Sequence, residues 1–311
     1  MSKQNSAVAY PGVSFGFMAR NGYYSTDEAA AEVDRMAELN VGAVALMATV
    51  MQDAYCSTRM YRDFAMTPGD WELMRMIERI HAAGMKVMLK PILECHDSTW
   101  RGLINFPEGQ QQIQGVVTDY WSAWFESLGD SLVHYGRMAE EAGVDLLCLG
   151  CEYHGAERRD ADWQGVLQRV REVYTGNLTY NAAGYHAIVE GNLPRWYDAL
   201  DILALSYYCG VGPDVEPTVD AMTAALQPTA ERLGAIAEAT GKPLLFAEAG
   251  CRSVQGGQQS PAQYRNAGDY DGDVQARWLE SVWRLFSDQP WWAGMFWWKW
   301  EEQQNRPHYH Q

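Results

Sequence analysis

A regular alternation of short apolar segments with longer segments of helical periodicity constrains the fold of this chain most strongly. This pattern is typical of parallel strands joined by crossover helices. The segments with strand character are residues 12–18, 43–48, 85–91, 145–150, 177–181, 202–207, 244–249 and 293–298. The clearest helix patterns lie at residues 25–40, 68–83, 120–142, 160–174, 220–240 and 273–287.

Eight strands in one alternating series favour a closed barrel over an open doubly wound sheet, and no GxGxxG motif follows the first strand. The sequence therefore predicts an α/β fold, a single (β/α)8 TIM barrel spanning residues 1–311, because no linker divides the chain. Ser25 and Glu28 have the spacing of a capping box, and Gly84 and Gly241 follow helix patterns as C-terminal glycines. Few residues follow Lys299, so we expect the last helix to be short or missing.

The charge balance limits the classes of partner. The chain has 40 acidic and 24 basic residues, a formal net charge of −16, which repels nucleic acid. No apolar run is long enough to span a membrane, and the polar first residues lack the pattern of a secretory signal. We therefore expect a cytoplasmic monomer or homodimer that binds neither nucleic acid nor membrane.

The cysteines and other potential ligands do not form a metal motif. Cys148 and Cys151 have CxxC spacing but lie on one strand-like run, with no second pair of ligands near them in the sequence. We expect no metal and no cofactor, and we interpret the cysteines as free thiols in a reducing compartment.

Active sites of such barrels form at the C-terminal ends of the strands. Two glutamates, Glu152 and Glu248, follow or end the fourth and seventh predicted strands. Glycoside hydrolysis needs two carboxyl groups, one to protonate the leaving oxygen and one to attack the anomeric carbon or activate water. Other polar and aromatic candidates at the strand ends, interpreted as substrate-binding residues, are Lys90, His96, Trp100, Arg101, Asn181, Tyr207, Tyr208, Arg252, Trp297 and Trp298.

Several segments together resemble glycoside hydrolase family 113. They are MLKP (88–91), TWRG (99–102), GCEY (150–153), LTYNA (178–182), FAEAGCRS (246–253) and FWWKW (296–300), in consistent order and spacing. That family belongs to the clan A retaining barrels and is best known for β-mannanases. The resemblance implies a retaining hydrolase that cleaves β-linked oligosaccharides by double displacement, with β-manno-oligosaccharides as the first expectation.

The resemblance also implies roles for individual residues. The glutamate ending the fourth strand, here Glu152, is the acid/base of the clan, and the one ending the seventh, here Glu248, is its nucleophile. Tyr207 or Tyr208 is expected to donate a hydrogen bond to the nucleophile. Trp297 or Trp298 is expected to form the floor of the −1 sugar subsite.

The chain departs from the clan pattern beside the acid/base. Clan members commonly have an asparagine there, which contacts the sugar 2-hydroxyl, whereas this chain has Cys151. A thiol is a weak donor and acceptor, so that contact is lost or is supplied by another residue such as Asn181. This leaves gluco-, xylo- and galacto-oligosaccharides as alternative substrates.

Two further alternatives remain beside the glycosidase. Lys90 could be the Schiff-base lysine of an aldolase, but the seventh and eighth strand ends carry a glutamate and tryptophans instead of a glycine-rich phosphate site. A non-catalytic carbohydrate-binding barrel would keep the aromatic cleft, but it would not need both glutamates. His96 has a simpler interpretation as a hydrogen-bonded loop residue, and Trp121 and Trp124 as packing between helix and barrel.

Overall fold

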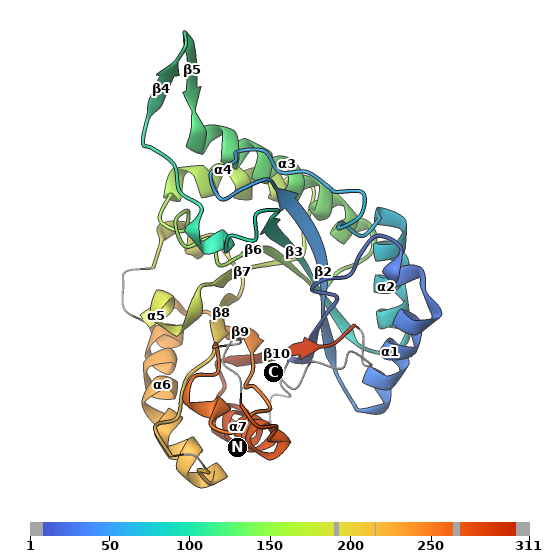
Figure 1. Ribbon diagram of the computed structural model, residues 1–311, viewed down its shortest axis with the longest axis vertical. Coiled ribbons are helices and arrows are strands. Elements are labelled where there is room, and N and C mark those ends of the chain that lie inside the picture. Colours follow the sequence, from blue (N-terminus) through green and yellow to red (C-terminus); the bar gives the residue numbers. More distant parts are fainter. Residues whose placement is uncertain (1–8, 190–192, 215, 264–267, 303–311) are drawn as a thin grey trace.

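The computed structural model describes residues 9–189, 193–214, 216–263 and 268–302. Parallel strands close into a barrel in the order β1, β10, β9, β8, β7, β6, β3, β2, as Figure 1 shows. Their bounds are β1 Tyr10–Phe15, β2 Ala43–Gln52, β3 Lys86–Cys95, β6 Leu146–Cys151, β7 Asn177–Ala182, β8 Leu203–Tyr207, β9 Leu244–Ala249 and β10 Trp292–Trp300. The predicted eight-stranded α/β barrel is confirmed, and each predicted strand overlaps one strand of it.

Helices surround this barrel (Figure 1). They are α1 Asp27–Glu38, α2 Asp70–Ala82, α3 Tyr120–Glu141, α4 Asp160–Arg171, α5 Gly184–Val189, α6 Val219–Thr240 and α7 Gly272–Phe286. Short 3-10 turns lie at η1 Tyr23–Ser25, η2 Arg101–Leu103, η3 Arg195–Ala199 and η4 Gly257–Gln259. The prediction of a short or missing eighth helix concerns residues 303–311, which lie outside the described residues. No helix of the described ranges is long and apolar enough to cross a membrane.

The start of α1 differs from the prediction. Ser25 ends the 3-10 turn η1, and Thr26 is the N-cap of α1, its hydroxyl accepting a hydrogen bond from the Ala29 backbone N–H at 3.1 Å. The predicted capping box of Ser25 and Glu28 is therefore wrong by one residue, because the chain makes one more tight turn before the helix begins. The predicted C-terminal glycines are confirmed, with φ of 82° at Gly84 and 66° at Gly241.

Side chains of the barrel divide between two hydrophobic clusters. Small and medium residues such as Ala45, Met88 and Ala204 fill the barrel interior. Larger residues pack between strands and helices, among them Trp121 and Trp124, which are almost completely buried. Their predicted role in packing α3 on the barrel is therefore confirmed. Near the C-terminal ends of the strands, the barrel interior holds polar side chains, because the apolar interior cluster does not extend that far.

Strands β2 and β3 are longer than predicted and pair in unbroken register from Ala43 with Lys86 to Gln52 with Cys95. Lys90 consequently lies within β3, and Glu94 lies near its end. Alternation along the strand puts both side chains on the same face as Met88, which belongs to the interior cluster. The extension of β3 therefore places two charged residues on the inner face of the barrel.

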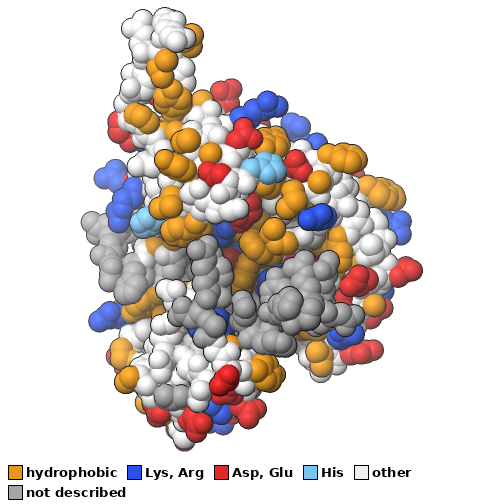
Figure 2. Space-filling view, in the orientation of Figure 1, with side chains coloured by type: hydrophobic (Ala, Val, Ile, Leu, Met, Phe, Trp, Pro, Cys, Tyr) orange, Lys and Arg blue, Asp and Glu red, His pale blue; other side chains and the backbone are white. Residues whose placement is uncertain are grey.

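A hairpin that the sequence did not predict projects from the molecule between β3 and α3 (Figures 1 and 2). It consists of β4 Gln110–Ile113 and β5 Val116–Asp119, which pair antiparallel. The segment QQQIQGVVTD lacks the alternation of apolar and polar residues that marks a half-buried strand. Its exposed Ile113, Val116 and Val117 have no core to face, so hydrophobic pattern could not reveal it.

Candidate active site

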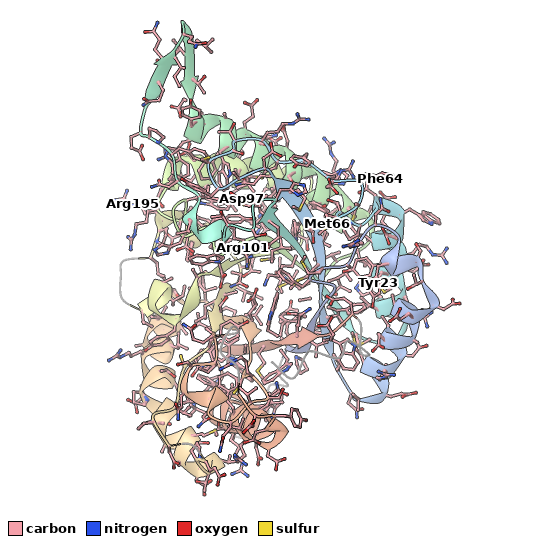
Figure 3. All side chains as sticks on the ribbon, viewed as in Figure 1. Tyr23, Phe64, Met66, Asp97, Arg101 and Arg195 are labelled. Carbon is pink, nitrogen blue, oxygen red and sulfur yellow. The ribbon has the colours of Figure 1, made fainter. Side chains whose placement is uncertain are left out.

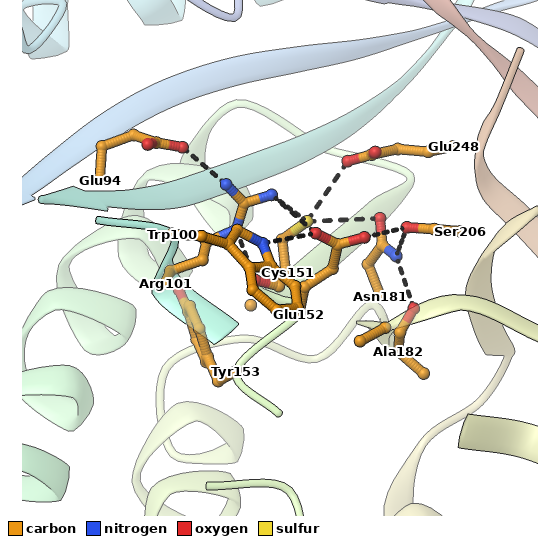
Figure 4. A network of polar contacts seen from close by, with 12 residues as sticks. Glu94, Trp100, Arg101, Cys151, Glu152, Tyr153, Asn181, Ala182, Ser206 and Glu248 are labelled. Carbon is orange, nitrogen blue, oxygen red and sulfur yellow. Dashed lines mark hydrogen bonds and ion pairs between the residues drawn. The ribbon is translucent and has the colours of Figure 1, made fainter. Parts of the chain in front are cut away.

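Glu152 and Glu248 come together at the C-terminal end of the barrel (Figure 4). Glu248 lies in β9, next to its last residue, and is 4% exposed. Glu152 follows β6 directly and adopts a positive φ of 59°, while its backbone N–H donates to the Asn181 carbonyl at 2.8 Å. Cys151 separates the two acidic groups and contacts Glu248 with its thiol at 3.3 Å.

Three donors surround the Glu248 carboxylate. Lys90 Nζ lies 2.6 Å from Oε1, and the Cys151 thiol donates to the same oxygen. The Tyr208 hydroxyl donates to Oε2 at 3.1 Å. Lys90 is completely buried and also donates to Asn181 Oδ1 at 2.7 Å. The carboxylate is thus held at both oxygens by side chains from different strands.

These contacts determine the charge of Glu248. Burial alone would favour the neutral acid, but the positive charges of Lys90 and Arg101 and the hydrogen bonds from Lys90 and Cys151 outweigh it, so the pKa of Glu248 is lowered. Burial also opposes the charge on Lys90, but the ionised Glu248 carboxylate, which accepts a hydrogen bond from it, raises the pKa of this ammonium above its ordinary value. Burial raises the pKa of the Cys151 thiol, which therefore stays protonated. The site holds an ionised glutamate paired with a charged lysine.

Glu152 has different partners. The Ser206 hydroxyl donates to Oε1 at 2.7 Å, while the Trp100 indole N–H and Arg101 Nη2 lie 3.2 and 3.3 Å from Oε2. Trp100 is 46% exposed, whereas Arg101 and Ser206 are buried. Oε1 of Glu152 is therefore bound by a buried hydroxyl, whereas Oε2 lies between the buried Arg101 and the partly exposed Trp100.

Arg101 joins the acidic groups of the site and lies near the middle of the molecule (Figure 3). Its guanidinium contacts Glu94 Oε1 at 2.7 Å and Glu152 Oε2, and it donates to the Cys151 carbonyl at 2.8 Å. Burial raises the pKa of Glu94, although Arg101 acts against this shift. That Arg101 binds substrate stays a prediction.

Asn181 connects the surroundings of the two glutamates. Its Oδ1 accepts from Lys90, and its Nδ2 donates to Ser206 Oγ at 2.9 Å. A continuous chain of hydrogen bonds thus runs from Glu248 through Lys90, Asn181 and Ser206 to Glu152. The amide of Asn181 is occupied on both sides by protein groups.

The structure distinguishes the two members of each aromatic pair. Tyr208 contacts Glu248, whereas the Tyr207 hydroxyl is hydrogen-bonded to Thr229 of α6 at 2.7 Å and its ring stacks on Phe246. Tyr207 is therefore not the partner of Glu248, because the alternation of β8 turns it toward the helices.

Trp298 and Trp297 differ in the same way. Lys90 Nζ lies 5.7 Å from the ring centroid of Trp298, which also packs edge-on against Phe17. The Trp297 ring lies 6.1 Å from that of Trp278 on α7. Trp297 therefore packs against the outside of the barrel, and only Trp298 joins the site.

His96 and Arg252 lie at the periphery. The His96 ring stacks on Tyr61, and its Nε2 lies 3.7 Å from Asp63 Oδ2, so its contacts are with the loop after β2 rather than with either glutamate. Arg252 is half-buried in the loop that follows β9. Their roles as sugar ligands stay predictions.

Sequence reasoning missed Ser206 and Glu94, which complete the polar network. Ser206 has the same parity along β8 as Ala204 of the interior cluster, and this signal places it inside the barrel. Glu94 lies beyond residue 91, the predicted end of the third strand, so its place on the inner face of β3 did not follow from the sequence. Within the described ranges, no group of three or more His, Cys, Asp or Glu residues could hold a metal ion.

Comparisons with known proteins agree with this geometry. The family model of Glycoside Hydrolase Family 113 matches residues 13–310. A GH113 β-mannanase, AaManA from Alicyclobacillus acidocaldarius, solved in complex with ManMIm, is 32% identical, with a TM-score of 0.82 over 96% of this chain and 89% of that one. A second GH113 β-1,4-mannanase structure is 29% identical, with a TM-score of 0.82 over 94% and 89% of the two chains.

More distant similarity concerns the fold alone. The endoglucanase Cel5A from Thermotoga maritima is 12% identical, with a TM-score of 0.62 over 96% of this chain and 91% of that one. The comparison with curated protein sequences returns no match.

The barrel and these similarities define the class of protein as a glycoside hydrolase of the (β/α)8 type, similar to mannanases. Within that class, the chain belongs to Glycoside Hydrolase Family 113, and the resemblance noted in its sequence motifs is confirmed.

Proposed function

We propose that this enzyme hydrolyses β-linked manno-oligosaccharides with retention of anomeric configuration, by double displacement. Glu248 is the nucleophile and Glu152 the general acid/base. The observation that carries the proposal is the difference between their surroundings: Glu248 is buried against the Lys90 ammonium with a lowered pKa, whereas Oε2 of Glu152 contacts the partly exposed Trp100. An ionised, oriented carboxylate and a reachable acid are what the two steps need.

In the first step, Glu248 attacks the anomeric carbon while Glu152 protonates the departing glycosidic oxygen. The electron pair of the broken C–O bond moves to that oxygen, and a covalent glycosyl-enzyme forms. Lys90 and Cys151 both bind Oε1 of Glu248, while among the residues that the structure describes Tyr208 is the donor at Oε2. We therefore assign Oε2 as the attacking oxygen, because it is bound by fewer and neutral donors.

In the second step, Glu152 takes a proton from water, and the resulting hydroxide attacks the anomeric carbon and releases Glu248. Arg101 lies beside Glu152 Oε2 and stabilises the carboxylate that exists between the two steps. Trp298 lies next to Lys90, and from there its ring can support the bound sugar.

The sugar specificity rests on the relatives and on one departure. The similar GH113 structures are those of β-mannanases. The Cys151 side chain is a thiol, and it donates to Glu248. The amide of Asn181 is bound by Lys90 and Ser206. Neither residue therefore offers a free amide to a sugar 2-hydroxyl. Gluco-, xylo- and galacto-oligosaccharides therefore remain second candidates.

A screen of β-1,4-linked oligosaccharides with product sizing tests the substrate. The proton NMR spectrum of the first product tests the stereochemistry, and we expect the β-anomer before mutarotation. Glu248→Ala should abolish turnover, and azide should restore it by forming an α-glycosyl azide. Release of the α-anomer, or undiminished hydrolysis by Glu248→Ala, would contradict the mechanism. Binding without turnover by the wild type would instead indicate a carbohydrate-binding barrel.

We further propose one catalytic domain over residues 1–311 that acts in the cytoplasm as a monomer or homodimer. The cysteines support this location, because all six are free thiols, as expected in a reducing compartment. Cell fractionation and light scattering of the purified protein test the location and the oligomeric state. Recovery in a secreted fraction, or a higher oligomer, would contradict them.

A further inference from the structure

Every contact of the Glu152 carboxylate in the described structure is with a hydrogen-bond donor, although this residue must become a donor itself. Trp100 and Arg101 can only donate, and they face Oε2. Ser206 faces Oε1, and its hydroxyl could in principle donate or accept. The direction of that hydrogen bond therefore decides which protonation state these surroundings favour.

The direction follows from Lys90. An ammonium only donates, so the Asn181 atom that faces Lys90 must be the amide oxygen. The amide nitrogen then faces Ser206 Oγ and donates to it. Ser206 directs its own hydrogen to Glu152 Oε1. With donors at both oxygens, this arrangement fits the ionised carboxylate and leaves no acceptor for a carboxylic acid proton.

The proton needed for catalysis is assigned to Oε2, the oxygen that the partly exposed Trp100 contacts. Of the two donors there, Arg101 is buried and fixed by Glu94 and the Cys151 carbonyl. Trp100 is 46% exposed, and its ring lies so close to Gly102 that a Cβ at that position would overlap it. Trp100 is thus the donor that can leave Glu152, while Arg101 and Ser206 stay in place.

We propose that Trp100 is a positioning residue whose indole N–H occupies Oε2 of Glu152 and is displaced by the incoming sugar, which couples substrate binding to protonation of the acid/base. This inference rests on the proposed function. When the indole leaves, Glu152 takes up one proton from solvent on Oε2. It then delivers that proton to the glycosidic oxygen, which receives the electron pair of the broken bond.

Other charged and titratable groups face Glu152 and set the background for any pH effect. They are Arg101 and Glu94 beside Oε2, Glu248 on β9, Cys151 on β6, Tyr208 after β8, and Glu157 in the loop after β6. A test of the Trp100 contact must leave these groups unchanged. Trp100→Phe does so, because it removes the N–H and keeps an aromatic ring.

The first test observes the indole directly and needs no turnover. In protein labelled with ¹⁵N-tryptophan, Trp100→Phe identifies the Trp100 indole signal by its absence. We expect this signal to depend on pH in the wild type and to lose most of that dependence in Glu152→Gln. In Glu248→Gln, saturating β-1,4-mannotriose should shift the signal away from its position in the empty protein.

Two results of this test would overturn the proposal. One is a Trp100 signal that titrates identically in the wild type and in Glu152→Gln. The other is a signal that stays unchanged when calorimetry shows mannotriose to be bound. If the signal follows Glu152 but no β-linked sugar is hydrolysed, the Trp100 contact stands and the proposed function fails, so the two failures are distinguishable.

The second test uses the pH dependence of hydrolysis. Loss of a donor destabilises the ionised carboxylate relative to the protonated acid, so the alkaline limb of kcat/KM for mannotriose should move upward by about one pH unit in Trp100→Phe. Gly102→Ala should move it in the same direction, because the added methyl group displaces the ring without altering Trp100. An aryl mannoside with a dinitrophenol leaving group needs no acid, and its profile should not move.

Trp71→Phe is the matched control, because Trp71 is an exposed tryptophan on α2 that stacks with Arg75. Its alkaline limb should match that of the wild type. An unmoved limb in both Trp100→Phe and Gly102→Ala, with both proteins folded by circular dichroism, would refute the coupling.

Discussion

Lys90 Nζ lies 2.6 Å from Glu248 Oε1, and both side chains are buried within the barrel. Removing two charges from water is costly, and their mutual attraction offsets this cost only while both are present. Lys90 has two acceptors here, Glu248 and Asn181, so the ammonium is also well hydrogen-bonded. The pair thus fixes the ionised state of the proposed nucleophile.

Lys90→Met should therefore raise the pKa of Glu248 and move the acidic limb of kcat/KM to higher pH by about 1–3 units. The mutant should also lose about 3–5 kcal/mol of stability near pH 7, because an unpaired charge stays buried. In the wild type the lowered pKa of Glu248 contributes stability that is lost on acidification. In the mutant the pKa of Glu248 is raised instead, so its contribution to stability increases on acidification, and Tm should rise as the pH falls. Thermal unfolding and pH–rate profiles measure both effects.

Two variants control this prediction. Lys86→Met removes a charge from the exposed first residue of the same strand and should leave the profile unchanged. Adding Glu248→Gln to Lys90→Met removes the unpaired charge and should restore part of the lost stability. A Lys90→Met protein with wild-type Tm and acidic limb would show that Glu248 does not depend on this ammonium.

Tyr208→Phe should lower kcat/KM for mannotriose about 10- to 100-fold, because it removes the hydroxyl that donates to Glu248 Oε2. Its neighbour provides the matched comparison. Tyr207→Phe loses the contacts of its hydroxyl with Thr229 and Cys209, so it should cost about 1 kcal/mol of stability and leave kcat/KM intact. Steady-state kinetics and denaturant unfolding separate the two. If Tyr207→Phe lowered kcat/KM and Tyr208→Phe lowered only stability, the assignment of Tyr208 to the inner face and of Tyr207 to the outer face of the barrel would be wrong.

A second neighbouring pair separates substrate binding from packing. Trp298→Ala removes a ring beside Lys90 and should weaken hydrolysis of mannotriose, mainly through a higher KM. Trp297→Ala opens a cavity against Trp278 and should cost about 3 kcal/mol of stability with little change in KM. Equal effects of both substitutions on KM would argue against a sugar platform at Trp298.

The fold could be predicted from the sequence because the hydrophobic periodicity of a strand or a helix is a local feature of the chain. The parity of β8 could also have selected between its tyrosines. Ile202 and Ala204 belong to the interior cluster, so alternation puts Ser206 and Tyr208 inside and Tyr207 outside.

Parity could not resolve the other strand ends. The ladder of β9 shifts register before Glu248, and that of β6 shifts between Cys148 and Cys151. Each shift turns the following side chains to the other face, which sequence alternation does not record. The contact of Trp100 with Glu152 also lies beyond local pattern, because it joins the loop after β3 to the end of β6.

Selective alkylation tests the state of the thiol beside the acid/base. Cys56 is exposed, whereas Cys151 is buried and burial raises its pKa, so the neutral thiol that donates to Glu248 should not react. Iodoacetamide at pH 8 should therefore modify Cys56 first and leave hydrolysis of mannotriose unchanged, as followed by peptide mass spectrometry. Cys56→Ser should lack this first modification, and Cys151 should be alkylated only after unfolding. Rapid alkylation of Cys151 in the folded protein, with parallel loss of activity, would mean that it is a reactive thiolate.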